Sequence, residues 1–90
     1  MEILKSSIAG TMESSDIMIT IEPGSGVVEI ELQSIVENQF GRQIRSAISD
    51  TLAELEVNSA KLTAVDKGAL DCTIQARVKT AVFRAAGELS

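Results

Sequence analysis

The chain has 90 residues, of which 44% are hydrophobic, and its aromatic residues are limited to Phe40 and Phe83. This length predicts a single domain over residues 1–90 with an aliphatic core. The net charge of −5 argues against binding to nucleic acid or to an anionic membrane surface, because both ligands require a basic face. No apolar run approaches the roughly 20 residues that cross a bilayer, and no signal peptide is evident, so we expect a cytoplasmic protein.

The sequence contains no histidine and a single cysteine, Cys72. A single cysteine excludes an intramolecular disulfide. The absence of histidine removes the commonest general base, the usual activator of a serine or cysteine nucleophile, and the commonest zinc ligand. Cys72 has no basic residue nearer in sequence than Lys67 and Arg77, so we expect a half-buried structural thiol. These features predict a chain that is not a stand-alone enzyme.

Alternation of apolar and polar residues predicts two strands near the N-terminus. Residues 7–12 alternate loosely, and residues 16–22 alternate strictly, which is typical of strands. The polar residues 13–16 between them predict a hairpin turn. Serine is not favoured where a tight turn needs positive φ, so we expect a longer or bulged loop. The residues predicted to face inward on the second strand are Ile17, Ile19 and Ile21.

A third strand is predicted over residues 27–33, after a turn at residues 23–26 with the sequence Pro-Gly-Ser-Gly. Ser34 is a candidate N-cap for the helix that follows, and Glu37 occupies the capping-box position. The outward residues of the strand form an acidic, solvated face. The residues predicted to face inward are Val28, Ile30 and Leu32.

The segment after Ser34 has the strongest helical periodicity in the chain. Its apolar residues recur with helical spacing and cover less than half of the helix circumference. Gly41 lies within this helix and costs it about 1 kcal/mol relative to alanine. The residues predicted to face the core are Val36, Phe40, Ile44, Ala47, Ile48, Thr51, Leu52 and Leu55.

A fourth strand is predicted over residues 61–66, and a strand–helix–strand unit favours a right-handed crossover between parallel strands. We expect Asp66 or Gly68 to open a second helix. Residues 71–79 also alternate as a strand would, but the helical period extends further, which favours a helix with Gly87 as its C-cap. The apolar face of this helix consists of Leu70, Ile74, Val78, Ala81, Val82 and Ala85.

These elements predict an α+β fold. Three strands are followed by a helix, a strand and a helix. The expected architecture is a small two-layer sandwich with both helices on one face of a mixed sheet. No internal repeat or linker is visible, which agrees with a single domain.

The turn at residues 13–16 contains two adjacent candidate site residues, Ser14 and Ser15, between Glu13 and Asp16. Serine and aspartate are common in turns because their side chains bond nearby backbone groups, and this is the simpler interpretation of the pattern. No base is available to activate either serine. A serine modified by another enzyme needs only exposure and mobility. Two carboxylates are too few for an oxygen-ligand metal site, so none is predicted.

A second, thinner apolar stripe is predicted on the last helix. It consists of Cys72, Ala76 and Phe83 and lies away from the main apolar face. The stripe either lines the edge of the core or forms a docking surface for a protein partner.

Three segments resemble the citrate lyase acyl carrier proteins, which are the gamma chains of that complex. Residues 9–16, Ala-Gly-Thr-Met-Glu-Ser-Ser-Asp, are followed by Met18-Ile19. Residues 35–41 are Ile-Val-Glu-Asn-Gln-Phe-Gly, and residues 66–72, Asp-Lys-Gly-Ala-Leu-Asp-Cys, are followed by Ala76-Arg77. The segments occur in the order and spacing of that family, and the resemblance covers nearly the whole chain.

The resemblance implies that Ser14 carries a 2'-(5''-phosphoribosyl)-3'-dephospho-CoA group through a phosphodiester, so that the holo form is a phosphoprotein. The thiol of this group would carry acetyl, which the alpha subunit, an acyl transferase, exchanges for citryl. The beta subunit, a citryl lyase, would then release oxaloacetate and restore the acetyl form. A dedicated transferase would attach the group. Some relatives have glycine at the position of Ser15, so Ser15 is a competing acceptor, and we assign Ser14 because it follows Glu13 as in the family pattern.

The resemblance therefore implies a non-catalytic carrier subunit that acts in citrate fermentation, in the cleavage of citrate to acetate and oxaloacetate. Two alternatives remain. The malonate decarboxylase acyl carrier protein uses the same kind of group on a similar small chain, although residues 66–72 favour citrate lyase. The chain could also be an unmodified α+β module that binds a protein partner through its last helix or its acidic third strand.

Overall fold

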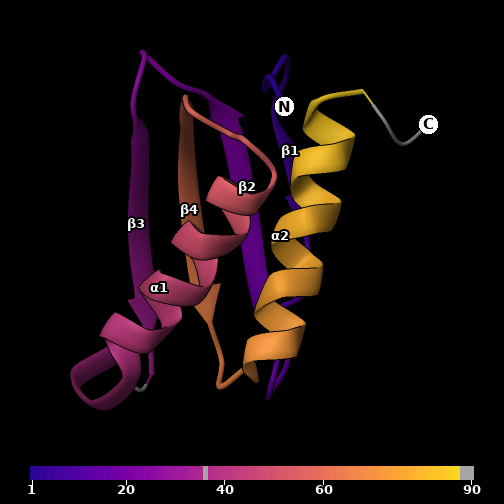
Figure 1. The fold of residues 1–90 in the computed structure, drawn as a ribbon. Coiled ribbons are helices and arrows are strands. Elements are labelled where there is room, and N and C mark those ends of the chain that lie inside the picture. The colour runs from indigo at the N-terminus through magenta and orange to yellow at the C-terminus, as the bar shows by residue number, and fades with distance from the viewer. Residues whose placement is uncertain (36, 88–90) are drawn as a thin grey trace.

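The computed structural model describes residues 1–35 and 37–87. Figure 1 shows one sheet in the order β1-β2-β4-β3, so that β4 lies between β2 and β3. The predicted order of the elements and the predicted α+β class are confirmed. The elements in chain order are β1 (Ser7–Ala9), β2 (Ile17–Pro23), β3 (Val28–Ser34), α1 (Glu37–Glu54), β4 (Ala60–Asp66) and α2 (Asp71–Ala85).

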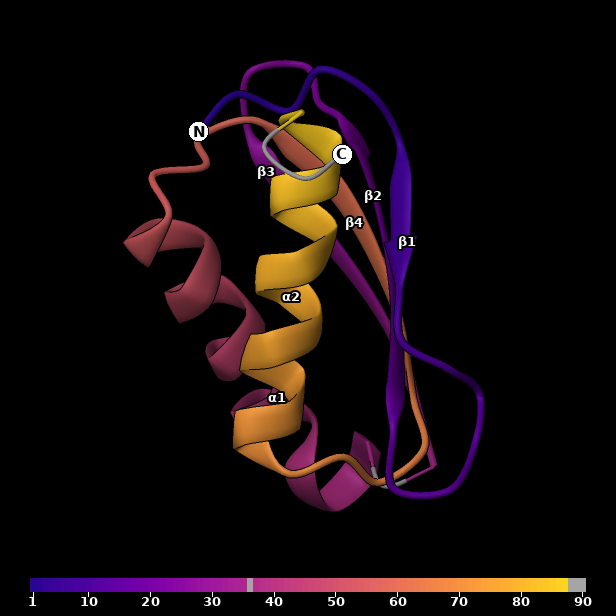
Figure 2. The same cartoon turned by 90° about the vertical axis from the view of Figure 1, so that its right-hand side faces the viewer.

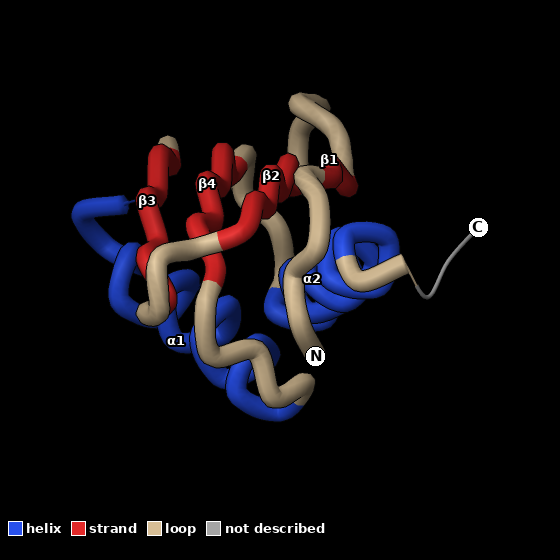
Figure 3. The backbone as a smooth tube through the Cα atoms, turned by 90° about the horizontal axis from the view of Figure 1, so that it is seen from above, coloured by secondary structure: helices blue, strands red, loops and turns tan. Residues whose placement is uncertain are grey.

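Both helices lie on one face of the sheet, as predicted. Figure 2 shows the two layers side by side, and the view from above in Figure 3 places α1 and α2 below the sheet. β2 runs antiparallel to β1 and to β4, whereas β3 and β4 are parallel. The parallel pair expected from the strand–helix–strand unit is therefore confirmed. The described part of the chain places no helix on the opposite face of the sheet.

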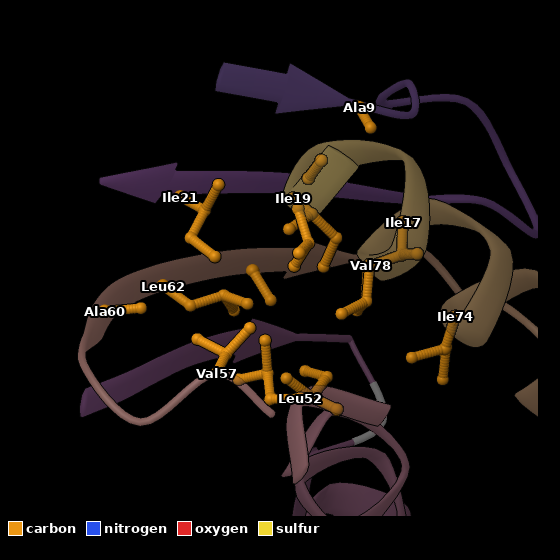
Figure 4. Close-up of a cluster of buried hydrophobic side chains, with 14 of the residues drawn as sticks. Ala9, Ile17, Ile19, Ile21, Leu52, Val57, Ala60, Leu62, Ile74 and Val78 are labelled. Carbon is orange, nitrogen blue, oxygen red and sulfur yellow. The ribbon is translucent and has the colours of Figure 1, made fainter. Parts of the chain in front are cut away.

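The core fills the space between the sheet and the helices and is aliphatic. Ile17, Ile19 and Ile21 of β2 are fully buried. They point toward Leu52 of α1 and Val78 of α2 in one cluster (Figure 4). Burial of such a side chain stabilises the fold by about 1.5–3 kcal/mol. The alternation in residues 16–22 therefore predicted the correct inward face.

The first strand and the second helix differ in extent from the predictions. β1 ends at Ala9 because Gly10 has a φ of 97°, which is not a strand conformation. α2 begins at Asp71 rather than at Asp66 or Gly68. Asp66 is the last residue of β4, and its carboxylate accepts hydrogen bonds from the amides of Gly68 (3.1 Å) and Ala69 (3.0 Å). These bonds hold a turn where the helix was expected.

The predicted N-cap Ser34 is instead the last residue of β3. Its hydroxyl donates to the carboxylate of Asp66 at 2.9 Å, so it links the ends of two strands. Val36 and the side chain of Glu37, which were predicted to face the core and to complete a capping box, lie outside the described residues.

Three residues that were predicted to lie in the core are exposed, and Ile30 and Leu55 are only partly buried. Phe40 is 49% exposed because the first turns of α1 extend past the end of β3 (Figure 1). Leu70 precedes α2 and is exposed. Val28 lies on the edge strand β3, where only Leu32 is fully covered. The predicted stop of α2 is confirmed, since Gly87 follows the C-cap residue with a φ of 80°.

The two faces of the sheet should respond differently to the loss of an isoleucine side chain. We expect Ile19→Ala to lower the free energy of unfolding by about 2–5 kcal/mol, because the residue is fully buried in the core. Ile8→Ala on β1 removes a side chain that is 55% exposed, and should cost about 0.5 kcal/mol or less. Urea unfolding measures both. Equal losses would contradict the assignment of the core to the helix side.

Candidate functional site

The candidate site is the loop between β1 and β2, residues 10–16, which we call the Ser14 loop. Figure 2 shows this loop bulging away from the helices, at the end of the sheet opposite the N-terminus. The amide of Asp16 donates to the carbonyl of Glu13 at 3.2 Å, and Ser15 has a φ of 65°. The expected longer loop is thus confirmed, with Ser14 and Ser15 at the corner of a turn inside it.

Ser14 is exposed, and its hydroxyl makes no hydrogen bond with residues 1–35 or 37–87. The backbone next to it is fixed. The amide of Ser15 donates to the carbonyl of Lys67, and the amide of Lys67 donates to the carbonyl of Asp16, both at 2.8 Å. These bonds join the Ser14 loop to the β4–α2 loop. The side chain of Ser14 is therefore accessible, while the backbone next to it is held in place.

Asp16 anchors the Ser14 loop to the rest of the molecule. Its carboxylate is nearly buried and accepts hydrogen bonds from the amide (3.1 Å) and hydroxyl (2.6 Å) of Thr11 and from the amide of Ile17 (2.7 Å). Arg77 of α2 reaches it as a fork, with Nε to Oδ1 at 3.0 Å and Nη2 to Oδ2 at 2.8 Å. Such paired contacts are among the stronger hydrogen bonds in proteins.

The same contacts change the acidity of Asp16. The hydrogen bonds from Arg77, and then that from Thr11, hold the pKa of Asp16 well below its usual range, against the smaller opposing effect of desolvation. Asp16 in turn raises the pKa of Arg77. The pair therefore remains ionised at neutral pH. A carboxylate this weakly basic and this fully bonded makes a poor general base.

Gly10 allows the chain to enter the Ser14 loop. It has a φ of 97°, and a Cβ atom at this position would overlap with the carbonyl oxygen of Ile17. Only glycine satisfies both conditions. The hydroxyl of Thr11 also accepts a hydrogen bond from the amide of Glu13 at 3.2 Å, which orders the part of the loop before Ser14.

Two hollows lie at the same end of the sheet and are bordered by exposed apolar side chains. One, of about 240 Å³, is lined in part by Met12, Ile35 and Lys67. The other, of about 430 Å³, lies between the start of α1 and the β4–α2 loop, and we call it the Phe40–Leu70 hollow. Its lining includes Phe40, Gln43, Ile44, Ala69, Leu70 and Asp71.

The residues that flank the serine pair separate in the structure. Glu13 is exposed, whereas Asp16 turns inward to Arg77, so the two do not form a carboxylate pair. No group of three potential metal ligands occurs among the described residues. The interpretation of Asp16 as a turn residue that bonds nearby backbone groups was right, since its carboxylate accepts from the amides of Thr11 and Ile17, but it missed the ion pair with Arg77.

The predictions for the surface of α2 were only partly right. Cys72 is exposed rather than half-buried, because it lies two residues before the buried Ile74 and therefore on the opposite side of α2. In the predicted stripe, Ala76 is also exposed and Phe83 is partly buried, so the stripe does not form a continuous edge of the core. Neither described helix is long and apolar enough to cross a membrane.

Sequence reasoning missed Arg77 as the partner of Asp16. The two residues are 61 positions apart, so no local pattern connects them. A weak signal was present, because Arg77 lies three residues after Ile74 and next to Val78, both of which face the core. A charged residue at the border of an apolar helix face often has a specific partner.

Comparison with known proteins gives the class of this protein. The family model described as "ACP: Malonate decarboxylase delta subunit (MdcD)" matches residues 4–85. One chain of the solved structure titled "Crystal structure of a Pseudomonas malonate decarboxylase hetero-tetramer in complex with malonate" has a TM-score of 0.77, covering 93% of this chain and 87% of that chain. Their sequences are 16% identical, so this likeness shows a shared fold. The class is that of a carrier domain of the malonate decarboxylase delta type.

Sequence relatives narrow the assignment. A citrate lyase acyl carrier protein of Streptococcus equi subsp. equi is 62% identical to this chain over 89 residues. A protein of the same name from Streptococcus uberis is 58% identical over 87 residues. Each match covers 97% of this chain and 86% of the relative. The protein of the same name from Latilactobacillus sakei subsp. sakei is 54% identical over 88 residues, which is 98% of this chain and 87% of the relative. The chain belongs to the citrate lyase acyl carrier protein family, and the predicted resemblance is confirmed.

The Ser14 loop should depend on glycine at its entrance. We expect Gly10→Ala to lower the free energy of unfolding by about 3 kcal/mol or more, because a side chain adds overlap with the Ile17 carbonyl to the strain of positive φ. Gly26→Ala is the matched control, since Gly26 has a φ of 103° but open space around it, and should cost about 1 kcal/mol. Urea unfolding compares them. Equal losses would show that the close approach is unimportant.

The Asp16–Arg77 pair should make stability depend on acidity. A folded-state pKa below the ordinary value of 3.8 means that the contribution of Asp16 is complete above that value and is lost as the pH falls below it. We expect Asp16→Asn to cost about 1–2 kcal/mol near neutral pH, a modest value because Arg77 is partly exposed. The difference from wild type should shrink below about pH 4.

Unfolding curves across this pH range measure the effect. Asp50→Asn, which removes an exposed carboxylate of α1, controls for the loss of one negative charge. A difference between wild type and Asp16→Asn that stays constant down to the acid transition would disprove the role of the ionised carboxylate.

Proposed function

We propose that the chain is the acyl carrier subunit of citrate lyase, and that Ser14 carries a 2'-(5''-phosphoribosyl)-3'-dephospho-CoA group through a phosphodiester. The family assignment and relatives of that name at 54–62% identity support the carrier role. The observation that carries the choice of site is the exposed and unbonded hydroxyl of Ser14 on a loop that is fixed beside it by Asp16 and Lys67. On such a loop the hydroxyl of Ser14 is accessible to a modifying enzyme.

The residues around Ser14 fit a phosphodiester. Lys67 belongs to the facing loop and is bonded through its backbone to Ser15 and Asp16. Its ammonium forms no ion pair within the described residues, while Arg77 is engaged by Asp16. A free cation beside the attachment point would attract the phosphate, although the net charge of the chain is −5. Lys67 is the residue that would hold this phosphate.

The chemistry of attachment must come from another protein. Ser14 Oγ would form a bond to the phosphorus of a precursor activated by a phosphate anhydride, and the anhydride P–O bond would break, releasing diphosphate. The hydroxyl proton must pass to a base of the transferase, because Asp16 is a poor base in this environment. This chain contributes an accessible acceptor in a fixed position.

The carrier role follows from the tether. When bound, the group supplies a thiol that carries the acyl unit as a thioester to the alpha and beta subunits. A tethered acyl unit meets each active site at an effective concentration on the order of millimolar, without dissociating from the complex. The fold keeps the proposed attachment point at one end of the sheet, on a loop that bulges away from both helices (Figure 2). We place this activity in the cytoplasm, in citrate fermentation.

A malonate decarboxylase carrier is the second candidate, since the matching family model bears that name. The identity of 54–62% to citrate lyase carriers, against 16% to the malonate decarboxylase chain, favours citrate lyase. Turnover of citrate rather than malonate by the isolated complex would distinguish the two.

The attachment site can be tested by intact mass and peptide mapping of protein from a native host. Wild type should carry one added group, and Ser14→Ala should lose it completely while remaining folded, because the side chain has no described contact. Ser15→Gly is the matched variant: glycine readily adopts the φ of 65°, so folding and modification should persist. An unmodified chain in an active complex, or a modified Ser14→Ala chain, would refute the proposal.

A further inference from the structure

The Phe40–Leu70 hollow has two exposed apolar side chains on its surface, and neither contributes to the core. Phe40 is one of two aromatic residues in the chain, and 49% of its surface is accessible, while Leu70 is 70% exposed. The hollow measures about 430 Å³, which is within the range of small-molecule sites in proteins. Apolar walls with a few polar groups at the border are also typical of such sites.

The polar border of the hollow is suited to the edge of a purine. Gln43 Nε2 donates to the Asp71 carboxylate at 3.5 Å, which is a long and weak hydrogen bond that a ligand can replace. An adenine presents an amino donor beside a ring-nitrogen acceptor, and a glutamine amide bonds that edge in a bidentate manner. The carboxylate of Asp71 can accept from the same amino group. The aromatic ring of Phe40 offers a stacking surface for a flat base.

The charge of the hollow selects a neutral group. Asp66 and Asp71 both line it, and none of the lysine or arginine residues that the structure describes does. A diphosphate would be repelled there, whereas a neutral heterocycle would not. Lys67, which lies next to the hollow in sequence, lines the neighbouring hollow instead.

The hollow is connected to the Ser14 loop through the β4–α2 loop, which contributes to its lining and is hydrogen-bonded to the Ser14 loop. Gly68 lines the hollow, and the residue before it, Lys67, is bonded through its backbone to Ser15 and Asp16. Gly68 has open space where a side chain would lie, so the path from Ser14 to the hollow is not blocked at this residue. In the prosthetic group proposed for Ser14, the adenosine is the part that follows the phosphoribosyl link, so it lies closer to the protein than the thiol does.

We infer that the Phe40–Leu70 hollow holds the adenine of the covalently attached group, with the base stacked on Phe40 and its polar edge bonded to Gln43 and Asp71. This inference rests on the proposed function. Holding the adenine leaves the diphosphate and the pantetheine segment as the mobile part of the arm. The length of this mobile part then determines how far the thiol can reach from the protein.

The test compares isotope-labelled apo and holo chains by NMR, with loading of Ser14 first established by intact mass. We expect chemical-shift differences at Phe40, Gln43 and Asp71 in addition to those of the Ser14 loop. Nuclear Overhauser effects should connect the adenine protons to the Phe40 ring. Phe40→Leu keeps an apolar side chain without a stacking surface, and should lose the shift differences at Gln43 and Asp71 while Ser14 is loaded as before.

Phe83→Leu is the matched control, because it changes the second aromatic residue, which lies on α2 and does not line the hollow, and should leave the adenine contacts unchanged. A loaded chain whose shifts change only in residues 10–16 would overturn this inference and leave the proposed function standing. Shifts in the hollow that arise only after addition of the alpha or beta subunit would overturn it in favour of protein docking. A chain that is not loaded at Ser14 would refute the proposed function and the inference together.

Discussion

The ion pair between Asp16 and Arg77 joins the two layers of the fold at the end that presents Ser14. Asp16 lies just before β2, and Arg77 lies on α2, so the position of the Ser14 loop depends on how the helix packs against the sheet. The packing of α2 is in turn set by Ile74 and Val78, which are fully buried. A fully supported loop places an attachment point more accurately than a loop held only by its own turn.

The ion pair with Arg77 also keeps Asp16 from acting as a base beside Ser14. A carboxylate bonded to Arg77, Thr11 and Ile17 has little capacity left to remove a proton from a neighbouring group. A carrier benefits from this arrangement, because a thioester held near an active base would be exposed to hydrolysis. The absence of histidine from the sequence has the same effect. Low reactivity of this chain agrees with the proposed function, in which other proteins carry out the bond chemistry.

Local periodicity predicted the elements and most of the core. Alternation in residues 16–22 and helical spacing on both helices identified inward faces correctly, because burial against one layer imposes those periods. The errors occurred where elements end. Phe40 has the right pattern for a covered face, but it lies in a turn of α1 that extends past the end of β3, which periodicity cannot detect.

Contacts distant in sequence were also beyond prediction. The pairing of Asp16 with Arg77, and of Ser34 with Asp66, depends on the strand order, in which β4 separates β2 from β3. The resemblance to a family directed attention to Ser14, and the structure adds that this residue is exposed on a fixed loop. The identity of the group proposed for Ser14 is a matter of chemistry that neither periodicity nor fold encodes.

The strand order also gives the molecule two functionally different ends. The N-terminus and the end of α2 lie together at one end of the sheet, and the Ser14 loop lies at the other (Figures 1 and 2). An affinity tag, a fluorophore or a fused domain joined near the chain ends would therefore lie away from Ser14. A protein that bound the chain-end side of the molecule would leave the Ser14 loop open to a second protein.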